Sequence, residues 1–497
     1  MTKPIVIEPA LHCDIDPTWK VVATQVLGKR IVVELWETVQ GQDTQREMEE
    51  VALTERKEQC ALIATFAETS QLEPDVIKAA ILALQTKVDL WRVAREQASP
   101  SVPGPDATRP TITVGSDMEP PVTALEHLLH AARHLGVYQR GHSICEIQEA
   151  GPAPKWLHRP PDLPRIAPSS AAHLRELASK VACFDLVNPR TYRLTRELPP
   201  PWMIETLMAR KKWCFPPLEG VVNVPTLCPD GALLVTKGYD PDTGLYLDYN
   251  GITFPPIDLS PTREQAQEAV ETLWDVFQDF PYLDHDTGFS ATLAALLSCV
   301  CRYSILGRIP MFVVRSSTRG SGKGKLIDAI SLIALGRTAP RMAQTLDEEE
   351  ERKRLMTIAL AGLPLLHIDN VNHPLGSAPL DYALTSPTYG DRLLGKNEEG
   401  EAPLNTVFFA SGNNMVFHGD TARRVIPIDL DPKEENPELR TDFTHADLEG
   451  WVAEQRPRLV HACLTLMRGF FAAQEAPKPL PAFGSFEPTV RLFWKLV

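Results

Sequence analysis

Unbroken apolar runs and apolar residues at helical spacing divide the second half of the chain into alternating helices and strands. Apolar residues three and four positions apart predict helices over 260–277 and 286–303, whereas short apolar runs at 311–314, 363–370 and 405–414 predict buried strands. Strands that alternate with helices are typical of an α/β fold built on a parallel sheet. We therefore predict an α/β core over 260–432, followed by a helical segment over 433–497.

The first half of the chain has more mixed patterns. A strand-like run at Ile31–Trp36 precedes charged sequence of helical spacing, which predicts a small α+β or helical module over 1–98. Pro, Ser, Gly and Asp dominate 99–121, so we expect a linker there with one short strand at Thr111–Val114. Helical patterns at 122–135 and 171–181, a hairpin-like segment at 137–147 and strands separated by turns predict an α+β module over 122–259.

Composition limits the partners that the chain could bind. Its 50 Lys and Arg residues against 64 Asp and Glu residues give a net charge of −14, which excludes a protein that coats nucleic acid or anionic lipid over its whole surface. The nine cysteines include no CxxC pair, as expected of a reduced, cytoplasmic chain. The longest apolar stretch, around 291–300, is too short to cross a bilayer, so we expect no membrane partner.

The strongest candidate for chemistry is a glycine-rich loop between a strand and a helix. The run MFVV at 311–314 leads into RSSTRGSGKGK and then into an apolar helix. Backbone N–H groups with no Cβ in the way, a helix N-terminus and a lysine can together bind a phosphate. The residues that would form this site are Gly320, Ser321, Gly322, Lys323, Gly324 and Lys325.

The loop departs from the pattern GxxxxGK[ST] at two positions. Ser317 replaces the first glycine, and Gly324 replaces the hydroxyl residue that normally contacts Mg²⁺. Ser321, Lys325 or water would have to compensate for the missing hydroxyl. A flexible surface turn is the alternative interpretation of the glycines.

Polar residues follow the next two apolar strands. Asp369 ends LPLLHIDN and could hold Mg²⁺ through water, although an ordinary turn would also explain it. Asn370 stands where a glutamate often activates water, so a base would have to come from elsewhere, and the acidic run Glu348–Glu351 is one candidate. Asn413 and Asn414 end NTVFFASGNN, where an amide could orient a water molecule; a pair of turn amides is the alternative.

Two groups of basic residues are further candidates. Arg423 and Arg424 lie between a turn and a strand, and could stabilise phosphate charge or pair with Asp420 and Asp429. Another basic group surrounds Trp202 and Trp213, for which a solvated surface over two core tryptophans is favoured over nucleic-acid binding. Its members are Arg190, Arg193, Arg196, Arg210, Lys211 and Lys212.

Taken in order, these motifs resemble the ATPase part of primase-helicases encoded by phages, plasmids and integrative elements, of the AAA+ and superfamily-three type. The resemblance covers about 200–486 and rests on GSGKGK (320–325), EERKRL (350–355), LLHIDNV (365–371), LTSPTYGDRLLGK (384–396), ASGNN (410–414) and GDTARRVIPIDL (419–430). It implies a P-loop NTPase core in which Lys323 and Asp369 bind Mg-ATP. Asn413 or Asn414 would sense the γ-phosphate, and Arg423 or Arg424 would reach the nucleotide of a neighbouring subunit.

The same resemblance implies a β-hairpin within 384–407, whose Arg392 and Lys396 would grip single-stranded DNA; the glutamates beside them leave an ordinary exposed hairpin as the alternative. The implied function is that of an ATP-dependent DNA helicase or translocase of a mobile genetic element. It would act in DNA replication as a homo-oligomeric ring, such as a hexamer, with a primase or a replication initiator as a further partner.

Two other functions stay open. The first is an ATP-binding switch or scaffold with little hydrolysis, and the second is a small phosphotransferase. Similar proteins continue past GSFE with a further helical segment, whereas this chain turns to PTVRLFWKLV, so the resemblance leads us to expect a truncated C-terminal lid.

Overall fold

The structure is a computed structural model that divides into two units, residues 1–108 and residues 109–497. Each unit is described by itself. The described residues are 5–14, 18–27, 30–39, 42–51, 56–98, 109–149, 163–188, 191–392, 399–434, 436–473 and 483–493.

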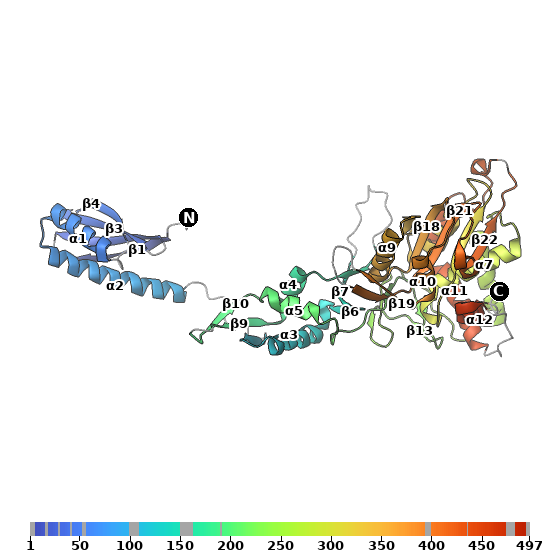
Figure 1. The fold of residues 1–497 in the computed structure, drawn as a ribbon, viewed down its shortest axis with the longest axis horizontal. Helices are drawn as coiled ribbons and strands as arrows, with labels where there is room; N and C mark the ends of the chain where they lie inside the picture. The colour runs from blue at the N-terminus through green and yellow to red at the C-terminus, as the bar shows by residue number, and fades with distance from the viewer. Residues whose placement is uncertain are drawn as a thin grey trace. The chain divides into compact units, whose positions relative to one another are not determined.

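The first unit is a four-stranded antiparallel sheet with two helices packed on one of its faces (Figure 1). Its elements are β1 (Ile5–Asp14), β2 (Trp19–Leu27), β3 (Arg30–Val39), β4 (Gln42–Val51), α1 (Arg56–Ser70) and α2 (Pro74–Ala98). Alternate residues of β2 and β3, such as Val21 and Leu35, are buried against Phe66 and Ile81 of the helices. The strand expected at Ile31–Trp36 is confirmed within β3, and the unit is an α+β module.

The second unit begins with a small α+β layer. Its elements are β5 (Thr111–Val114), α3 (Glu119–Ala131), η1 (Arg133–Leu135), β6 (Tyr138–Arg140), β7 (Ser143–Gln148), β8 (Arg165–Pro168), α4 (Ala171–Val181), β9 (Cys183–Val187), β10 (Leu194–Glu197) and α5 (Pro201–Ala209). The hairpin expected at 137–147 is β6–β7, and the helix expected at 171–181 is α4. The strand expected at Thr111–Val114 is β5, and α3 begins at Glu119, so regular secondary structure occupies part of the stretch that composition marks as a linker.

Short strands connect this layer to the core of the unit. They are β11 (Gly220–Val222), β12 (Thr226–Leu227), β13 (Leu233–Leu234), β14 (Gly238–Asp240) and β15 (Leu245–Leu247). They form one three-stranded sheet, in the order β11-β15-β14, and one two-stranded sheet, β12-β13.

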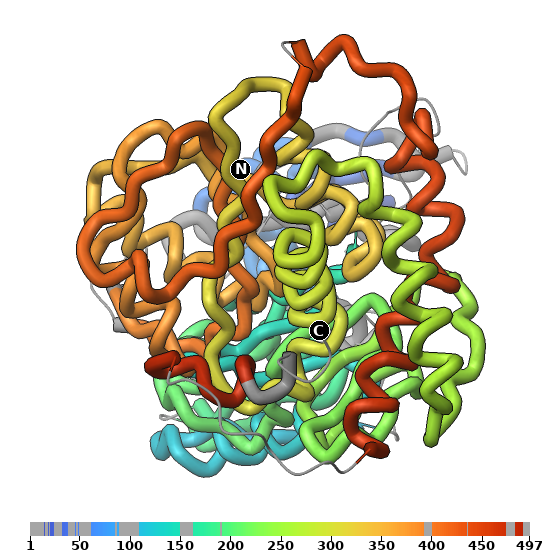
Figure 2. Tube along the Cα trace, turned by 90° about the vertical axis from the view of Figure 1, so that its right-hand side faces the viewer, coloured from blue at the N-terminus to red at the C-terminus, as the bar shows by residue number. Residues whose placement is uncertain are grey.

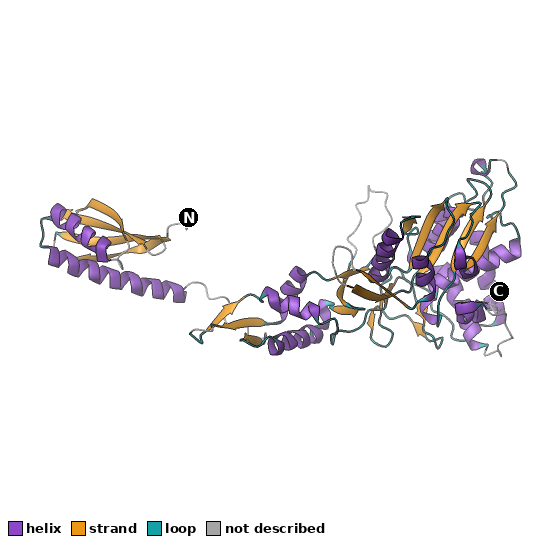
Figure 3. Cartoon of the chain, viewed as in Figure 1, coloured by secondary structure: helices purple, strands orange, loops and turns teal. Residues whose placement is uncertain are grey.

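The core is a five-stranded parallel sheet in the order β17-β18-β21-β16-β22 (Figure 3). Its strands are β16 (Met311–Ser316), β17 (Arg341–Ala343), β18 (Leu365–Val371), β21 (Val407–Asn413) and β22 (Val425–Leu430). The three strands expected from apolar runs are β16, β18 and β21. These findings confirm an α/β fold with a parallel sheet for this part of the chain.

Helices cover both faces of this sheet, which explains why its strands are unbroken apolar runs rather than alternating ones. Phe312 and Val314 of β16 pack against one set of helices, and Met311 and Val313 pack against the other. The first set is α6 (Arg263–Phe277), α7 (His285–Val300), α8 (Lys323–Leu335) and α11 (Leu448–Ala472); the second is α9 (Glu348–Ala361) and α10 (Ala378–Thr385). Figure 2 shows α11, in orange-red, running alongside the yellow-green helices that include α6, against which it packs.

The helix expected over 260–277 is α6, which begins at Arg263, so Pro261 precedes the cap and is not in the first turn. Thr262 caps the helix by accepting a hydrogen bond from the backbone N–H of Gln265 (3.3 Å), and the Gln265 side chain accepts one from the Thr262 N–H (2.7 Å). This reciprocal arrangement is a capping box.

The expected β-hairpin is also present. It pairs β19 (Thr388–Arg392) with β20 (Glu399–Pro403) in an antiparallel ladder. Arg392 is the last residue of β19, and Lys396 lies outside the described residues.

The remaining short elements follow the sheet or connect its helices. They are η2 (Arg302–Ser304), η3 (Gly419–Arg424), η4 (Pro437–Leu439), η5 (Gly484–Phe486) and α12 (Glu487–Phe493). The segment 483–493, where we expected a shortened lid, packs on the core: Phe486 is buried, and the Thr489 hydroxyl donates to the Arg308 carbonyl oxygen (2.7 Å). Within the described part of the chain, every helix is too short or too polar to cross a membrane.

Candidate functional site

A pocket of about 680 Å³ lies where β16, β18 and β21 end. The chain leaves β16 through α8 on one face of the sheet and leaves β18 toward α10 on the other face. Such a reversal opens a crevice beyond the carboxyl ends of parallel strands, which is where open α/β sheets bind ligands. The volume is within the range of sites that take small molecules or cofactors.

The glycine-rich loop forms one wall of this pocket. Gly320 and Gly322 have φ values of +72° and +84°, a left-handed conformation that favours glycine. A Cβ at Gly320 would lie 2.7 Å from Glu438 Oε2. Gly322 is the N-cap of α8, so Lys323, Gly324 and Lys325 form the first helical turn, whose backbone N–H groups lack intrahelical partners. A loop of this shape can bind an anion.

Lys323 is held at the centre of the pocket by three oxygen atoms. Its Nζ donates to Asn413 Oδ1 (2.7 Å), to Ser321 Oγ (2.9 Å) and to the Thr318 carbonyl oxygen (3.1 Å). Burial lowers the pKa of Lys323, and the nearby Asp369 carboxylate opposes that shift. The structure therefore brings together three predicted site residues, Lys323, Asn413 and Ser321.

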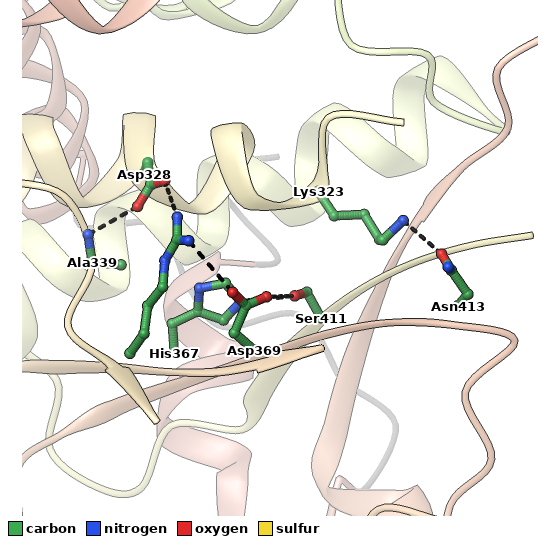
Figure 4. Close-up of polar contacts among 8 residues, drawn as sticks. Lys323, Asp328, Ala339, His367, Asp369, Ser411 and Asn413 are labelled. Carbon is green, nitrogen blue, oxygen red and sulfur yellow. Dashed lines mark hydrogen bonds and ion pairs between the residues drawn. The ribbon is translucent and has the colours of Figure 1, made fainter. Parts of the chain in front are cut away.

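Asp369 lies in the same pocket, within a network that the sequence did not indicate (Figure 4). The guanidinium of Arg341, on β17, spans two carboxylates: Nη2 donates to Asp328 Oδ2 (2.5 Å), and Nη1 lies 3.4 Å from Asp369 Oδ2. Asp328, on α8, is buried and accepts the backbone N–H of Ala339 (3.0 Å). Asp369 thus faces the pocket with one cation already beside it.

A serine and a histidine orient Asp369 from the other side. Ser411 Oγ donates to Asp369 Oδ1 (3.0 Å) and lies 2.8 Å from Nε2 of the fully buried His367. Burial lowers the pKa of His367 to about 4, so the ring is neutral at neutral pH. With the serine hydroxyl committed to Asp369, a neutral His367 protonated at Nε2 donates to Ser411 Oγ.

The two amides at the end of β21 differ in position. Asn413 lines the pocket and bonds Lys323. Asn414 has a φ of +46° and donates its backbone N–H to the Ser316 carbonyl oxygen (3.1 Å). Asn370 also has a positive φ, +55°, and lines the pocket after Asp369. Asn413 is therefore the better placed of the two candidate amides.

The two adjacent arginines also differ. Arg424 has a side chain only 15% exposed, with Nη1 2.6 Å from Asp381 Oδ1. Arg423 is 71% exposed and pairs with Asp420 three residues earlier (2.5 Å). Neither lines the pocket, which is formed by described residues of this one chain.

Two other sequence candidates have structural roles. The acidic run at the start of α9 forms pairs along its own helix, Glu348 with Arg352 and Glu349 with Lys353, and none of its four residues lines the pocket. The suggestion that this run supplies a base is therefore wrong for this geometry.

In the basic group around the tryptophans, Arg196 and Arg210 have structural roles, while Arg193, Lys211 and Lys212 are exposed. Trp213 is buried and donates to the Leu207 carbonyl oxygen (2.7 Å). Arg196 pairs with Asp185, and Arg210 pairs with Glu126. The favoured interpretation of core tryptophans under a solvated surface agrees with this, while Arg190 lies outside the described residues.

Apolar and aromatic side chains also line this pocket. They include Phe280, Val276, Phe443 and Leu448, together with the ring of His445. The His445 ring stacks on Trp451 with centroids 3.8 Å apart, and Arg440 lies over the Phe443 ring at 4.8 Å. These side chains can contact a flat apolar group, and Lys323 can contact an anion.

The described residues contain no cluster of three or more His, Cys, Asp or Glu side chains that could hold a metal ion. Mg²⁺ that arrives with a nucleotide needs only one or two protein carboxylates, because phosphate oxygens and water complete its shell. Asp369 and the Ser411 hydroxyl therefore fit such an ion.

Asp328 and Ser411, which the sequence analysis did not identify, each interrupt an apolar pattern. Asp328 interrupts the apolar helix LIDAISLIAL, and a carboxylate there needs a partner. Ser411 is a polar residue within an otherwise apolar strand. Nothing in the sequence pattern singles out Arg341, whose role depends on how β17 pairs with β18.

Comparison with known proteins adds little. No protein-family model matches the chain, and no curated protein matches it. Among solved structures, the C-terminal region of NrS-1 in its apo A form shares 16% identity, covering 45% of this chain and 53% of that chain at a TM-score of 0.28. A second structure of that region, also the apo A form, shares 12% identity over 65% of this chain and 74% of that chain, at a TM-score of 0.32. JCV helicase shares 12% identity over 47% of this chain and 60% of that chain, at a TM-score of 0.26. The chain thus spans about half of the first of these structures, and at such TM-scores the likeness carries no argument about fold or function.

Proposed function

We propose that this chain is a P-loop ATPase that hydrolyses ATP and moves on single-stranded DNA as a helicase or translocase of a mobile genetic element. The observation that supports it is the pocket at the carboxyl ends of the parallel strands, where Lys323, Asp369 and Asn413 converge. Lys323 and the backbone N–H groups of the loop suit a triphosphate, and the aromatic side chains that line the pocket suit a base.

The chain's own groups divide the work at this site. The backbone N–H groups of the glycine-rich loop and the Lys323 ammonium bind the phosphates. Asp369 and Ser411 would hold Mg²⁺, and the ion would supply neutralisation of the phosphate charge. Asn413, which accepts a hydrogen bond from Lys323, would orient the attacking water.

Arg423 is the better candidate for a residue that reaches a neighbouring subunit. Its side chain is exposed and its partner, Asp420, is also exposed, so the pair is weak and easily exchanged. Arg424 is largely buried and pairs with Asp381 and Asp420, so we assign it the role of stabilising the turn that carries Arg423. This assignment requires a homo-oligomer, which we propose to be a ring.

The β19–β20 hairpin is the proposed contact for single-stranded DNA, through Arg392 and Lys396. Phosphate contacts by such residues would make the affinity dependent on salt, because bound counterions are released. A primase or a replication initiator is a further proposed partner.

A second function is supported by one specific observation. Gly324 provides no hydroxyl, and Asn370 rather than a glutamate follows Asp369. A site that binds ATP but lacks a strong base would act as a switch or scaffold.

The test is ATP hydrolysis by the purified chain with and without single-stranded DNA, with the oligomeric state recorded at each point. We compare Lys323→Ala with Lys353→Ala, which removes an exposed lysine of α9 that pairs with Glu349. Hydrolysis that DNA stimulates, that Lys323→Ala abolishes and that Lys353→Ala leaves intact supports the motor. ATP binding without turnover on any DNA contradicts the motor and favours the switch, and no ATP binding contradicts both.

A further inference from the structure

The position of the absent hydroxyl is occupied from another element. A Cβ built at Gly324 would lie 3.7 Å from Nη2 of Arg341, an ordinary contact distance. Gly324 has no left-handed backbone, so a larger residue is compatible with its helical conformation. The cationic head of Arg341 therefore stands next to the place from which a serine or threonine would act.

Arg341 is firmly anchored in this position. Its Nη2 pairs with Asp328, whose side chain is 6% exposed and is itself fixed by the Ala339 N–H. Its Nη1 reaches Asp369, while the side chain is 48% exposed and lines the pocket. A guanidinium has five N–H donors, so donors remain for a ligand after these two contacts.

We propose that Arg341 replaces the missing P-loop hydroxyl: its guanidinium binds a phosphate oxygen of the nucleotide and holds Asp369 in place. This inference rests on the proposed nucleotide site. Arginine is well suited to phosphate because its planar donors match the phosphate oxygens.

The replacement has a consequence that a hydroxyl would not have. A hydroxyl acts by coordinating Mg²⁺ and carries no charge, whereas Arg341 balances phosphate charge without an ion. Nucleotide binding by this chain should therefore depend weakly on Mg²⁺. The competing explanation is that Arg341 only neutralises the buried Asp328.

The experiment measures the affinity for ATP by titration calorimetry, with Mg²⁺ and with a chelator. In the wild type, removal of Mg²⁺ weakens binding by less than about tenfold. Arg341→Gln weakens binding in the chelator by about tenfold to a hundredfold, the range for one charge-assisted hydrogen bond. Adding Gly324→Ser to Arg341→Gln restores affinity in Mg²⁺ but not in the chelator, because the hydroxyl acts through the ion.

Two further variants separate this role from a structural one. Arg341→Gln combined with Asp328→Asn removes the buried charge together with its partner, so thermal unfolding returns toward that of the wild type while nucleotide binding stays weak. Arg315→Gln is the matched control, since Arg315 pairs with Asp429 between β16 and β22 and does not line the pocket.

The outcomes are distinct. Wild type that does not bind ATP in either condition contradicts the proposed function, and the inference with it. If the wild type binds ATP and Arg341→Gln binds it equally well in the chelator, the inference is overturned while the proposed function stands. The inference is also overturned if the double variant Asp328→Asn, Arg341→Gln regains the wild-type affinity for ATP, because the role of the arginine would then be structural.

Discussion

Arg140, at the end of β6, joins three parts of the second unit. Its side chain is 2% exposed, and its guanidinium donates to the carbonyl oxygens of Ala359 on α9 (3.0 Å), of Leu218 (2.9 Å) and Glu219 (2.6 Å), and of Pro403 on β20 (2.7 Å). These bonds fix the base of the β19–β20 hairpin to the core helix α9. The next residues add to the contact, because the His142 N–H donates to the Glu401 carbonyl oxygen (3.1 Å).

Replacing Arg140 by methionine keeps most of the side-chain volume and removes every donor. Each carbonyl oxygen left buried without a partner costs roughly 1–3 kcal/mol. Four such groups, partly relieved where water enters, give an expected destabilisation of about 3–5 kcal/mol. Burial lowers the pKa of Arg140, yet the guanidinium stays charged at neutral pH. Arg140→Met therefore also removes a positive charge from this buried position.

The assay is amide hydrogen exchange read by mass spectrometry on the peptide that contains 399–403, with urea unfolding of the whole chain beside it. In Arg140→Met, we expect exchange of this peptide to speed up by on the order of 100-fold, which corresponds to about 3 kcal/mol of lost local stability. The control is Arg165→Met on β8 of the same small sheet. Arg165 is exposed, and among the described contacts it bonds only the Gln148 side chain. We expect this variant to change the free energy of unfolding by less than about 0.5 kcal/mol.

A second variant tests the same contact by sterics. Gly141 has a φ of +52°, and a Cβ there would lie 1.7 Å from the Glu401 carbonyl oxygen, so Gly141→Ala must push β20 away. If the hairpin peptide exchanges at the wild-type rate in both Arg140→Met and Gly141→Ala, the argument that this turn clamps the hairpin is refuted.

Three further predictions follow from single contacts. Thr262→Ala removes the cap of α6 and should lower the free energy of unfolding by about 1 kcal/mol in urea titrations, whereas Thr262→Ser should change it little. Arg424→Ala should lower the free energy of unfolding by about 1–2 kcal/mol, and Arg423→Ala should lower it by less than about 0.5 kcal/mol. In ATPase assays, however, Arg423→Ala should abolish turnover while ATP binding is retained. Gly320→Ala combines a positive φ with a close contact to Glu438. Calorimetry should show ATP binding weakened by at least about tenfold, and urea titrations should show a free energy of unfolding lowered by about 1–3 kcal/mol.

The parts of the fold that the sequence predicts are those whose signal is local. Strand β16, the glycine-rich loop and helix α8 follow one another within 25 residues. Residues 42–51 form strand β4 and not the helix that the charged sequence after Trp36 predicts, because the polar sequence QDTQREMEEV is held in the sheet by pairing with β3.

Among the residues of the site, too, only those with a local sequence signal could be predicted. Lys323 and Asp369 could be found because each ends or begins an apolar element, in a pattern that a phosphate site requires. Arg341 and Asp328 could not, since their pairing exists only once β17 lies beside β18 and α8 packs over the sheet. Likewise, the difference between Arg423 and Arg424 is a difference in burial, and adjacent residues of one type carry no sequence signal for it.

Helix α9 connects the two regions on which these experiments act. In the middle of α9, Arg354 donates to the Ala343 carbonyl oxygen of β17 (3.3 Å), the strand that carries Arg341. Near the end of α9, Ala359 accepts from Arg140, which also donates to Pro403 of β20. Because the same helix is bonded to β17 and to Arg140, a shift of β17 on nucleotide binding could reach the base of the hairpin. Contact alone does not establish coupling between two sites. If the sites are coupled, ATP slows the exchange of the 399–403 peptide in the wild type, and this effect is lost in Arg140→Met. An equal effect of ATP in both proteins would show that Arg140 supports the hairpin without transmitting the state of the pocket.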